Sequence, residues 1–170
     1  MLIKESESQH KIRFMDCDPI GHLSNIRYFD YMLNAREDHC LQNYQLDNFE
    51  QSKKTGRLWV ALQNQIAYIK EVKFNQVVVI TSKIVKFSNR INTVEILMCN
   101  EDKSIIHAVL WTTVIYFNLT TRRSEDQPEH FMKLFHDICI KIPEESFEER
   151  VDSLRKQNKI NLQKNDYNRN

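Results

Sequence analysis

The sequence predicts an α+β protein in which one long helix packs against a single antiparallel sheet. One uninterrupted helical segment precedes four strand-like segments that are joined by short polar breaks. Short links indicate antiparallel neighbours, because parallel strands need long crossovers. The chain has 170 residues, the size of one domain. A lone long helix buries its apolar face if the sheet curls around it.

The helix is expected over residues 25–44, where no proline or glycine interrupts the chain. Ser24 or Asn25 is a natural N-cap, because its side-chain oxygen can accept a hydrogen bond from the first turn. Several side chains recur every three or four residues and therefore share one face of the helix. These side chains are Phe29, Met32, Leu33, Arg36 and Cys40.

Alternating or β-branched segments predict the strands. One is expected before the helix, at 10–17, and four after it, at 58–69, 76–87, 91–99 and 105–117. The pattern then becomes helical, with helices expected at 129–141 and 144–157 and a frayed or disordered end at 158–170. We therefore expect a domain over residues 1–142 and a helical or disordered extension over 143–170.

The composition argues against several classes of protein. The 24 basic and 23 acidic residues give a net charge of +1, without the basic excess of a nucleic-acid or anionic-membrane protein. Only two glycines occur, Gly21 and Gly56. Dinucleotide-binding loops, phosphate-binding loops and the nucleophile elbow of serine hydrolases need several closely spaced glycines.

The cysteine pattern and the hydropathy predict a reduced cytoplasmic protein. The four cysteines form no closely spaced pair, and the N-terminal segment is polar. No stretch approaches the roughly 18 apolar residues of a membrane helix. His136 and Cys139 share a helix face, but a zinc site needs at least one further ligand in a suitable place, and His130 does not complete one. No metal site is therefore expected.

The segment from Arg13 to Asn25 carries the most informative chemistry. Asp18-Pro19-Ile20-Gly21 fits a type I turn, and Pro19 forces Asp18 into an extended conformation. Asp18 is thus held on a stiff corner before the helix N-terminus, whose first N–H groups lack internal partners. Such N–H groups can stabilise an oxyanion while a nearby carboxylate attacks a carbonyl or activates water.

Each of these residues also has an ordinary structural interpretation when it is taken alone. An aspartate such as Asp18 commonly opens a turn, and a lone histidine such as His22 is commonly packed or solvated. Asn25 alone is a helix cap. Asp16 is expected to be structural, and Asp30 inside the helix is a reserve candidate for the carboxylate.

The combination is more specific than its parts. Asp-x-Asp-Pro-x-Gly-His-x-x-Asn, over Asp16 to Asn25, resembles the hotdog-fold acyl-CoA thioesterases of the 4-hydroxybenzoyl-CoA thioesterase family. The resemblance extends over about residues 9–135. It implies a long helix wrapped by a curved antiparallel sheet of about five strands. It also implies a homodimer or homotetramer with its sites at the subunit interface.

The resemblance also implies roles for individual residues. Asp18 matches the catalytic carboxylate, acting as general base or nucleophile, and the N–H of Asn25 or a neighbour matches the oxyanion donor. His22 is expected to orient Asp18, water or the carbonyl. Tyr28 and Phe29 are expected to line the acyl pocket, although core packing is an open alternative for both.

The substrate is then an acyl-CoA or acyl-carrier-protein thioester, hydrolysed without a metal or a separate cofactor, since coenzyme A belongs to the substrate. Arg90, Arg122 or Arg123 is expected to meet the coenzyme A phosphates, with solvated surface charge as the alternative. Ile20 stands where some relatives have asparagine, and Ser24 stands where an asparagine is often found before the helix. Two other functions stay open: a non-catalytic acyl-CoA-binding hotdog protein, and a hotdog hydratase or dehydratase.

Overall fold

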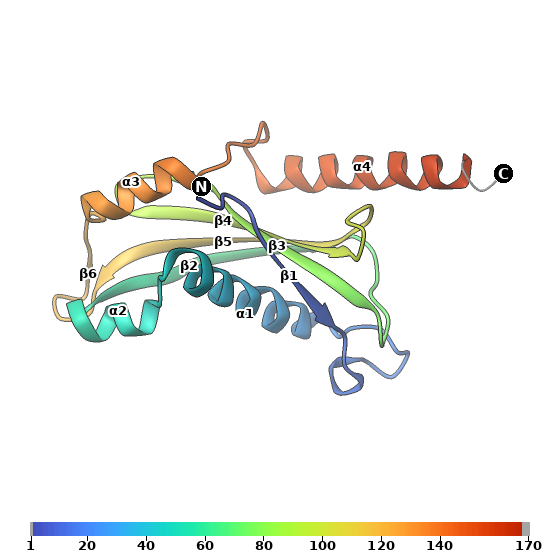
Figure 1. Cartoon of the computed structure of the whole chain (residues 1–170), viewed down its shortest axis with the longest axis horizontal. Helices are drawn as coiled ribbons and strands as arrows, with labels where there is room; N and C mark the ends of the chain where they lie inside the picture. The colour runs from blue at the N-terminus through green and yellow to red at the C-terminus, as the bar shows by residue number, and fades with distance from the viewer. Residues whose placement is uncertain (1, 168–170) are drawn as a thin grey trace.

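A six-stranded antiparallel sheet wraps around one long helix in the computed structural model, which describes residues 2–167, with side chains to residue 164 (Figure 1). The strand order is β1-β3-β4-β5-β2, and the short β6 pairs with β5. The expected α+β hotdog arrangement is confirmed. The strands are β1 (Ser6–Lys11), β2 (Arg57–Tyr68), β3 (Val77–Phe87), β4 (Ile91–Asn100), β5 (Ile106–Asn118) and β6 (Arg123–Ser124).

The long helix α1 spans Asn25–Tyr44, as the sequence predicts. The side chains that it buries are Tyr28, Met32, Ala35 and His39. This buried face is shifted by about one residue from the face that the sequence predicts. The difference arises because two polar side chains on this stripe find buried partners. The Tyr28 hydroxyl accepts from the Val72 N–H at 3.3 Å, and the His39 ring lies between two serine hydroxyls.

The two faces of the sheet pack against different helices, as strand alternation requires. On β4, Val94, Ile96 and Met98 belong to the core that faces α1. The neighbouring Cys99, with Trp111 of β5, belongs to a second core on the convex face. The sheet therefore separates a concave side that holds α1 from a convex side.

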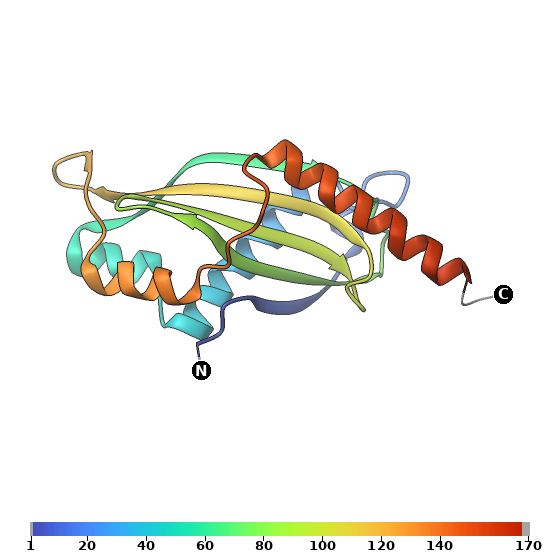
Figure 2. The same ribbon diagram turned by 90° about the horizontal axis from the view of Figure 1, so that it is seen from above.

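Helix α4 (Phe147–Tyr167) lies across this convex face (Figure 2). Phe147, Val151 and Leu154 share the buried side of the helix, as their spacing predicts. The expectation of a frayed end was wrong for residues 158–167, which continue the helix. Asn158 explains part of this order, because its buried amide bonds both the N–H and the C=O of Ile106. Residues 168–170 lie outside the described part of the chain.

The N-terminal strand was also predicted wrongly. β1 ends at Lys11, and the 3₁₀ turn η1 (Phe14–Asp16) follows instead of strand. The N–H of Cys17 donates to the carbonyl of Phe14 at 3.1 Å, which closes this turn. The chain thus coils tightly just before Asp18.

Two further helices complete the described structure. α2 (Asn48–Thr55) was not predicted and begins behind Asp47, whose side chain accepts from the N–H groups of Phe49 and Glu50. α3 (Glu129–Ile138) follows Pro128 as expected. None of the described helices carries an apolar stretch long enough to cross a membrane.

Candidate functional site

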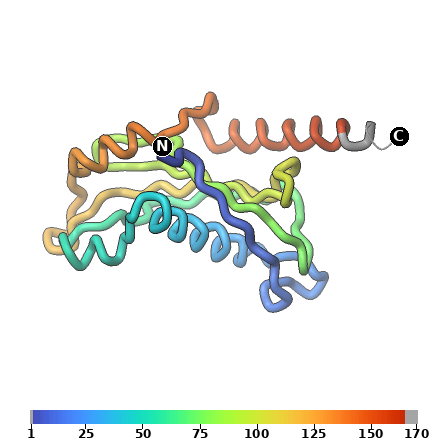
Figure 3. Tube along the Cα trace, viewed as in Figure 1, coloured from blue at the N-terminus to red at the C-terminus, as the bar shows by residue number. Residues whose placement is uncertain are grey.

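Two loops at one end of α1 build the candidate site. The loop over residues 12–24 contains the motif, and the loop over 69–76 joins β2 to β3 (Figure 3). The Leu23 N–H donates to the Val72 carbonyl at 2.8 Å, and the Phe74 N–H donates to the Gly21 carbonyl at 2.9 Å. These hydrogen bonds hold the motif against the end of β2.

The expected tight turn is present. The Gly21 N–H donates to the Asp18 carbonyl at 3.0 Å, and Gly21 has a φ of +82°, where a residue with a Cβ would be strained. The Asp18 carboxylate oxygen Oδ1 accepts from the N–H groups of Ile20 and His22, both at 3.0 Å. Its other oxygen, Oδ2, has no hydrogen-bond partner among the described residues. Asp18 is therefore fixed in place with one oxygen available to a ligand.

The structure brings Asp18 together with the start of α1. A hollow of about 220 Å³ is lined by Asp18, His22, Leu23, Asn25, Tyr28, Tyr68, Ile69, Lys70 and Glu71. The Tyr68 hydroxyl donates to the Asn25 carbonyl at 2.8 Å and so ties the end of β2 to the helix start. All three expected catalytic residues, Asp18, His22 and Asn25, line this one hollow.

The first turn of α1 offers backbone N–H groups beside the hollow. Ser24 occupies the N-cap position but makes no side-chain capping hydrogen bond. The first backbone N–H groups of a helix lack intrahelical partners and carry partial positive charge. Here the Arg27 N–H donates to the Ser24 carbonyl at 2.8 Å, whereas the N–H groups of Asn25 and Ile26 have no hydrogen-bond partner among the described residues and can donate to a carbonyl oxygen.

The charged side chains opposite the motif come from the loop that follows β2. Lys70 and Glu71 line the hollow, and an isolated β-bridge pairs His22 with Lys73. A hydrogen bond from its own backbone N–H, followed by the charge of His22, lowers the pKa of the Glu71 carboxyl. Burial raises the pKa of the Tyr28 hydroxyl, so this hydroxyl stays protonated at neutral pH. The hollow therefore combines cationic, anionic and hydroxyl groups around Asp18.

Asp18 also borders a second, more apolar hollow of about 440 Å³. Phe14, Met15 and Phe74 contribute its apolar surface, and the rings of Phe14 and Phe74 meet edge to face at 5.9 Å. These apolar side chains are largely exposed. Asp18 thus lies between a polar hollow and an apolar hollow, which suits a ligand with both kinds of surface.

The other motif carboxylates point elsewhere. Asp16 accepts from the Tyr31 hydroxyl at 2.7 Å, and Asp30 accepts from the Arg27 guanidinium at 2.8 Å. Both carboxylates line a different hollow, beside Tyr31. Asp16 and Asp30 are therefore engaged in protein contacts away from the start of α1.

The expected substrate-binding residues are only partly brought to the site. Tyr28 is buried and lines the polar hollow, whereas Phe29 is half-buried against the core. Arg90 pairs with Asp126, and the Arg122 guanidinium lies 5.6 Å from the centre of the Phe117 ring.

Arg90 and Arg122 lie at the end of the sheet that is far from Asp18, as the course of β5 shows. At the site end of β5, the His107 ring bonds the Lys70 carbonyl at 3.2 Å. Phe117, beside Arg122, follows ten residues later, about 33 Å along an extended strand. Arg123 is in β6 at that end. None of the three arginines lines a hollow with Asp18, and their contact with a coenzyme A phosphate stays a prediction.

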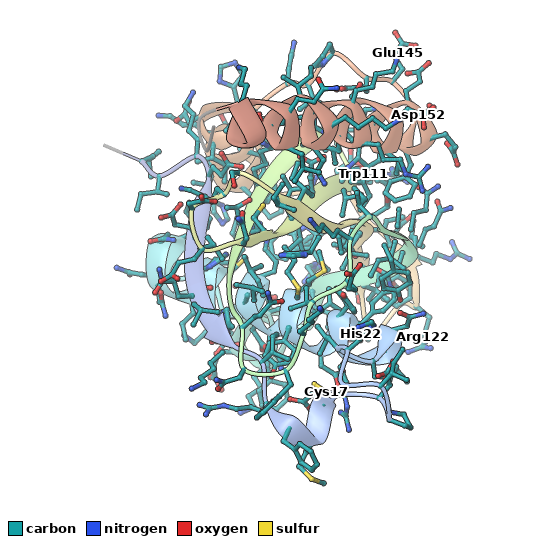
Figure 4. The ribbon with its side chains drawn as sticks, turned by 90° about the vertical axis from the view of Figure 1, so that its right-hand side faces the viewer. Cys17, His22, Trp111, Arg122, Glu145 and Asp152 are labelled. Carbon is teal, nitrogen blue, oxygen red and sulfur yellow. The ribbon has the colours of Figure 1, made fainter. Side chains whose placement is uncertain are left out.

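Sequence reasoning did not find Tyr68, Lys70 or Glu71. They stand more than forty positions after Asp18 and have no motif of their own. Only the antiparallel course of β2 beside α1 returns them to the helix start (Figure 1). Figure 4 shows His22 and Cys17 on the side of the sheet away from α4.

No group of three or more metal-ligating side chains occurs among the described residues. The four cysteines, all within the described part, are free thiols.

A long helix inside a curled antiparallel sheet defines the hotdog class of proteins. The model of the thioesterase-like superfamily matches residues 12–135, which is more than half of the chain. The chain belongs to this superfamily. No curated protein matches the chain by sequence.

Solved structures of low sequence identity share the fold. A Staphylococcus aureus protein in complex with CoA superposes with a TM-score of 0.73 at 15% identity, covering 85% of this chain and 91% of that one. A DHNA-CoA thioesterase from Staphylococcus aureus gives 0.67 at 16% identity, covering 79% and 87%. The probable thioesterase YbaW from Escherichia coli gives 0.67 at 22% identity, covering 78% and 98%.

Proposed function

We propose that this protein hydrolyses acyl thioesters of coenzyme A or of an acyl-carrier protein. The observation that carries the proposal is the placement of Asp18. One oxygen of its carboxylate is held by two backbone N–H groups, and the carboxylate lines the same hollow as the first turn of α1. A carboxylate and an oxyanion donor at one point are the two groups that thioester hydrolysis requires.

In the proposed reaction, the thioester carbonyl oxygen lies against the N–H groups at Asn25. The free Oδ2 of Asp18 either removes a proton from an attacking water or attacks the carbonyl carbon itself, in which case water then hydrolyses the mixed anhydride that forms once the thiolate has left. Negative charge then develops on the carbonyl oxygen, where the helix dipole stabilises it. The carbon–sulfur bond breaks and the thiolate leaves. In this proposal His22, which also lines the hollow, orients the carboxylate or the water.

The comparisons support the substrate class by analogy. One structurally similar protein was solved with CoA, and another is described as a DHNA-CoA thioesterase. The apolar hollow beside Phe14 and Phe74 supports binding of an apolar part of the thioester next to Asp18.

We also propose that the protein assembles as a homodimer or a homotetramer. Strand β2 is at the edge of the sheet, and its residues from Val60 to Asn64 are exposed. An unpaired edge strand presents free N–H and C=O groups to a second strand. Exposed Leu62 adds an apolar side chain to this edge.

The test is thiol release from a panel of acyl-CoA esters, from acetyl to palmitoyl together with benzoyl types. Asp18→Asn is expected to lower turnover at least about a hundredfold, the scale of general acid–base catalysis. The asparagine oxygen can still accept the Ile20 and His22 N–H groups, so the turn is retained. Asp16→Asn is the matched control and is expected to keep most of the activity.

Thermal unfolding of each variant separates a loss of chemistry from a loss of fold. Undiminished turnover by Asp18→Asn would move the chemistry to another residue, with Asp30 tested next. Absence of turnover by the wild type on every CoA and carrier-protein ester would contradict the proposal. Single-turnover hydrolysis in ¹⁸O-labelled water then distinguishes a nucleophilic Asp18, which takes up label, from a general base.

A further inference from the structure

A second cavity lies on the concave side of the sheet, toward the other end of α1. Its volume of about 370 Å³ is within the range of about 300 to 1,000 Å³ that small-molecule sites occupy. The lining is mostly apolar and includes Leu33, Trp59, Val94 and Phe135. It shares no lining residue with the hollow at Asp18. The cavity is therefore a separate feature of the molecule.

Arg36 brings a positive charge into this apolar lining. The side chain is half-buried, and its Nη1 donates to the Ser82 hydroxyl at 3.3 Å. No carboxylate among the described residues lies within ion-pair distance of its guanidinium. A guanidinium has five N–H donors, so four are left without a described protein partner.

The Arg36 donors without a protein partner are not fully buried. Every fully buried side-chain nitrogen and oxygen in the described part of the chain has a hydrogen-bond partner. The remaining Arg36 donors consequently keep access to solvent or to a ligand. A cation in an apolar cavity is normally paired, because desolvation disfavours a lone charge.

The positive charge of Arg36 affects the protonation of a neighbouring side chain, His39. Burial and then Arg36 lower the pKa of the His39 imidazole. Glu37 also lines the cavity but is exposed, and its carboxylate forms no ion pair with Arg36. The cavity lining thus includes one half-buried cationic side chain, Arg36, and one exposed anionic side chain, Glu37.

We propose that this cavity binds an apolar molecule that carries a carboxylate, and that the Arg36 guanidinium receives the carboxylate. A guanidinium matches a carboxylate by two parallel charge-assisted hydrogen bonds. The apolar part of the ligand lies against Leu33, Trp59 and Phe135. The ligand is either a free carboxylic acid or the distal carboxylate of an acyl group whose thioester end lies elsewhere.

Titration calorimetry with decanoate and decanol tests the site. We expect decanoate to bind about tenfold more tightly than decanol, the effect of one hydrogen bond to a charged group. Arg36→Gln is expected to remove this preference, and Arg36→Lys to retain part of it. Glu37→Gln is expected to tighten decanoate, because it removes a repulsive charge. Equal binding of both ligands, or decanoate binding that Arg36→Gln leaves unchanged, would overturn the proposal.

A cavity-filling variant keeps the test independent of the folding of the Arg36 variants. Leu33 lines the cavity yet is 37% exposed, so Leu33→Trp is expected to fill the space without disturbing the core. Both ligands should then lose affinity, whereas Asp18→Asn should bind decanoate as the wild type does. Unchanged decanoate binding by Leu33→Trp would place the ligand outside this cavity.

Hydrolysis assays distinguish the two sources of the carboxylate. Asn25 and Arg36 are eleven residues apart on α1, about 16 Å at 1.5 Å per residue. If the carboxylate belongs to an acyl group, hexadecanedioyl-CoA is hydrolysed with a higher kcat/KM than palmitoyl-CoA, and Arg36→Gln removes the difference. If it belongs to a free acid, the two esters react equally while decanoate still binds. Failure of all hydrolysis affects only the proposed function, because the calorimetry does not depend on it.

Discussion

Asp18 has a structural function in the turn and, in the proposed reaction, a chemical one. Its Oδ1 stabilises the turn by accepting two backbone N–H groups, and its Oδ2 is left for a ligand. An aspartate that opens a turn is commonly only a turn residue. Here the turn itself places the carboxylate beside the start of α1, so the two interpretations are compatible.

At the same scale, His39 is a buried histidine held between two hydroxyls. Its Nδ1 lies 2.8 Å from the Ser82 Oγ, and its Nε2 lies 2.9 Å from the Ser8 Oγ. Burial, followed by the charges of Arg36 and His10, lowers the pKa of His39 below its ordinary value of 6.5. His39 therefore joins α1 to β1 and β3 in its neutral form.

This environment predicts a loss of stability in mild acid. Near pH 6.5 and below, the unfolded chain binds a proton at His39 that the folded chain binds only at lower pH. The free energy of unfolding is thus highest above about pH 6.5 and falls as the pH drops through this value. Urea unfolding between pH 8 and pH 5 measures the slope.

His39→Gln is expected to make that pH dependence shallower. It should not abolish it, because burial also lowers the pKa values of His10 and His107. His136→Gln, at an exposed position, is the control and should leave the profile unchanged. A His39→Gln profile as steep as that of the wild type would disprove the assignment.

At the scale of elements, α4 is attached to the sheet by a buried ion pair as well as by apolar contacts. The Glu95 carboxylate accepts from Arg150 Nε at 2.7 Å and Nη2 at 2.8 Å, and from Trp111 Nε1 at 3.0 Å. Lys83 Nζ lies 3.6 Å from the same carboxylate, whose side chain is fully buried. Figure 4 shows Trp111 close beneath α4.

Arg150→Met is expected to lower the free energy of unfolding by about 3 to 5 kcal/mol, because it leaves Glu95 buried without its main partner. The double variant Glu95→Leu with Arg150→Met should lose less, since no carboxylate is then stranded. Arg155→Met, at an exposed pair on the same helix, should change stability by about 0.5 kcal/mol or less. Urea unfolding monitored by tryptophan fluorescence measures all three, and equal losses in the single and double variants would contradict the stranded-charge argument.

The elements also show which parts of the fold were accessible from sequence. The bounds of α1 were predicted correctly because a polar N-cap region precedes a long segment without proline or glycine. Helix α2 was missed because none of its side chains is buried, so it has no apolar stripe. The end of β1 was misplaced because the 3₁₀ turn at Phe14–Asp16 continues its alternating pattern.

The same distinction applies to the candidate site. The turn at Asp18 was predictable because proline and glycine determine it locally. Lys70, Glu71 and the cavity at Arg36 depend on how β2 and β4 lie beside α1, which no local pattern encodes. The expected face of α1 failed for a related reason, since Tyr28 and His39 are buried through partners on distant segments.

At the scale of the whole molecule, the convex face is covered by α4, whereas the outer edge of β2 is unpaired in the described chain. We expect β2 of one copy to pair with β2 of another. Sedimentation equilibrium should then give a mass of at least twice 20.4 kDa. Leu62→Lys introduces a charge at this edge and is expected to shift the equilibrium toward the monomer.

A charge change on the outer surface of α4 provides the control. Lys156→Glu, at an exposed position of α4, should leave the mass unchanged. A monomeric wild type at micromolar concentration would contradict the proposed assembly. A Leu62→Lys dimer as stable as that of the wild type would place the interface elsewhere.

The strand order has a further consequence for how the chain acquires its structure. β3, β4 and β5 follow one another through short turns, whereas β1 must find β3, and β2 must find β5, across long intervening segments. Closing long loops costs entropy before any pairing offsets it, and folding slows as contacts become less local. We therefore expect a three-stranded meander as the folding nucleus, with both edge strands added late. The loops that hold Asp18 join those edge strands to the rest, so the candidate site is completed only in the last steps of folding.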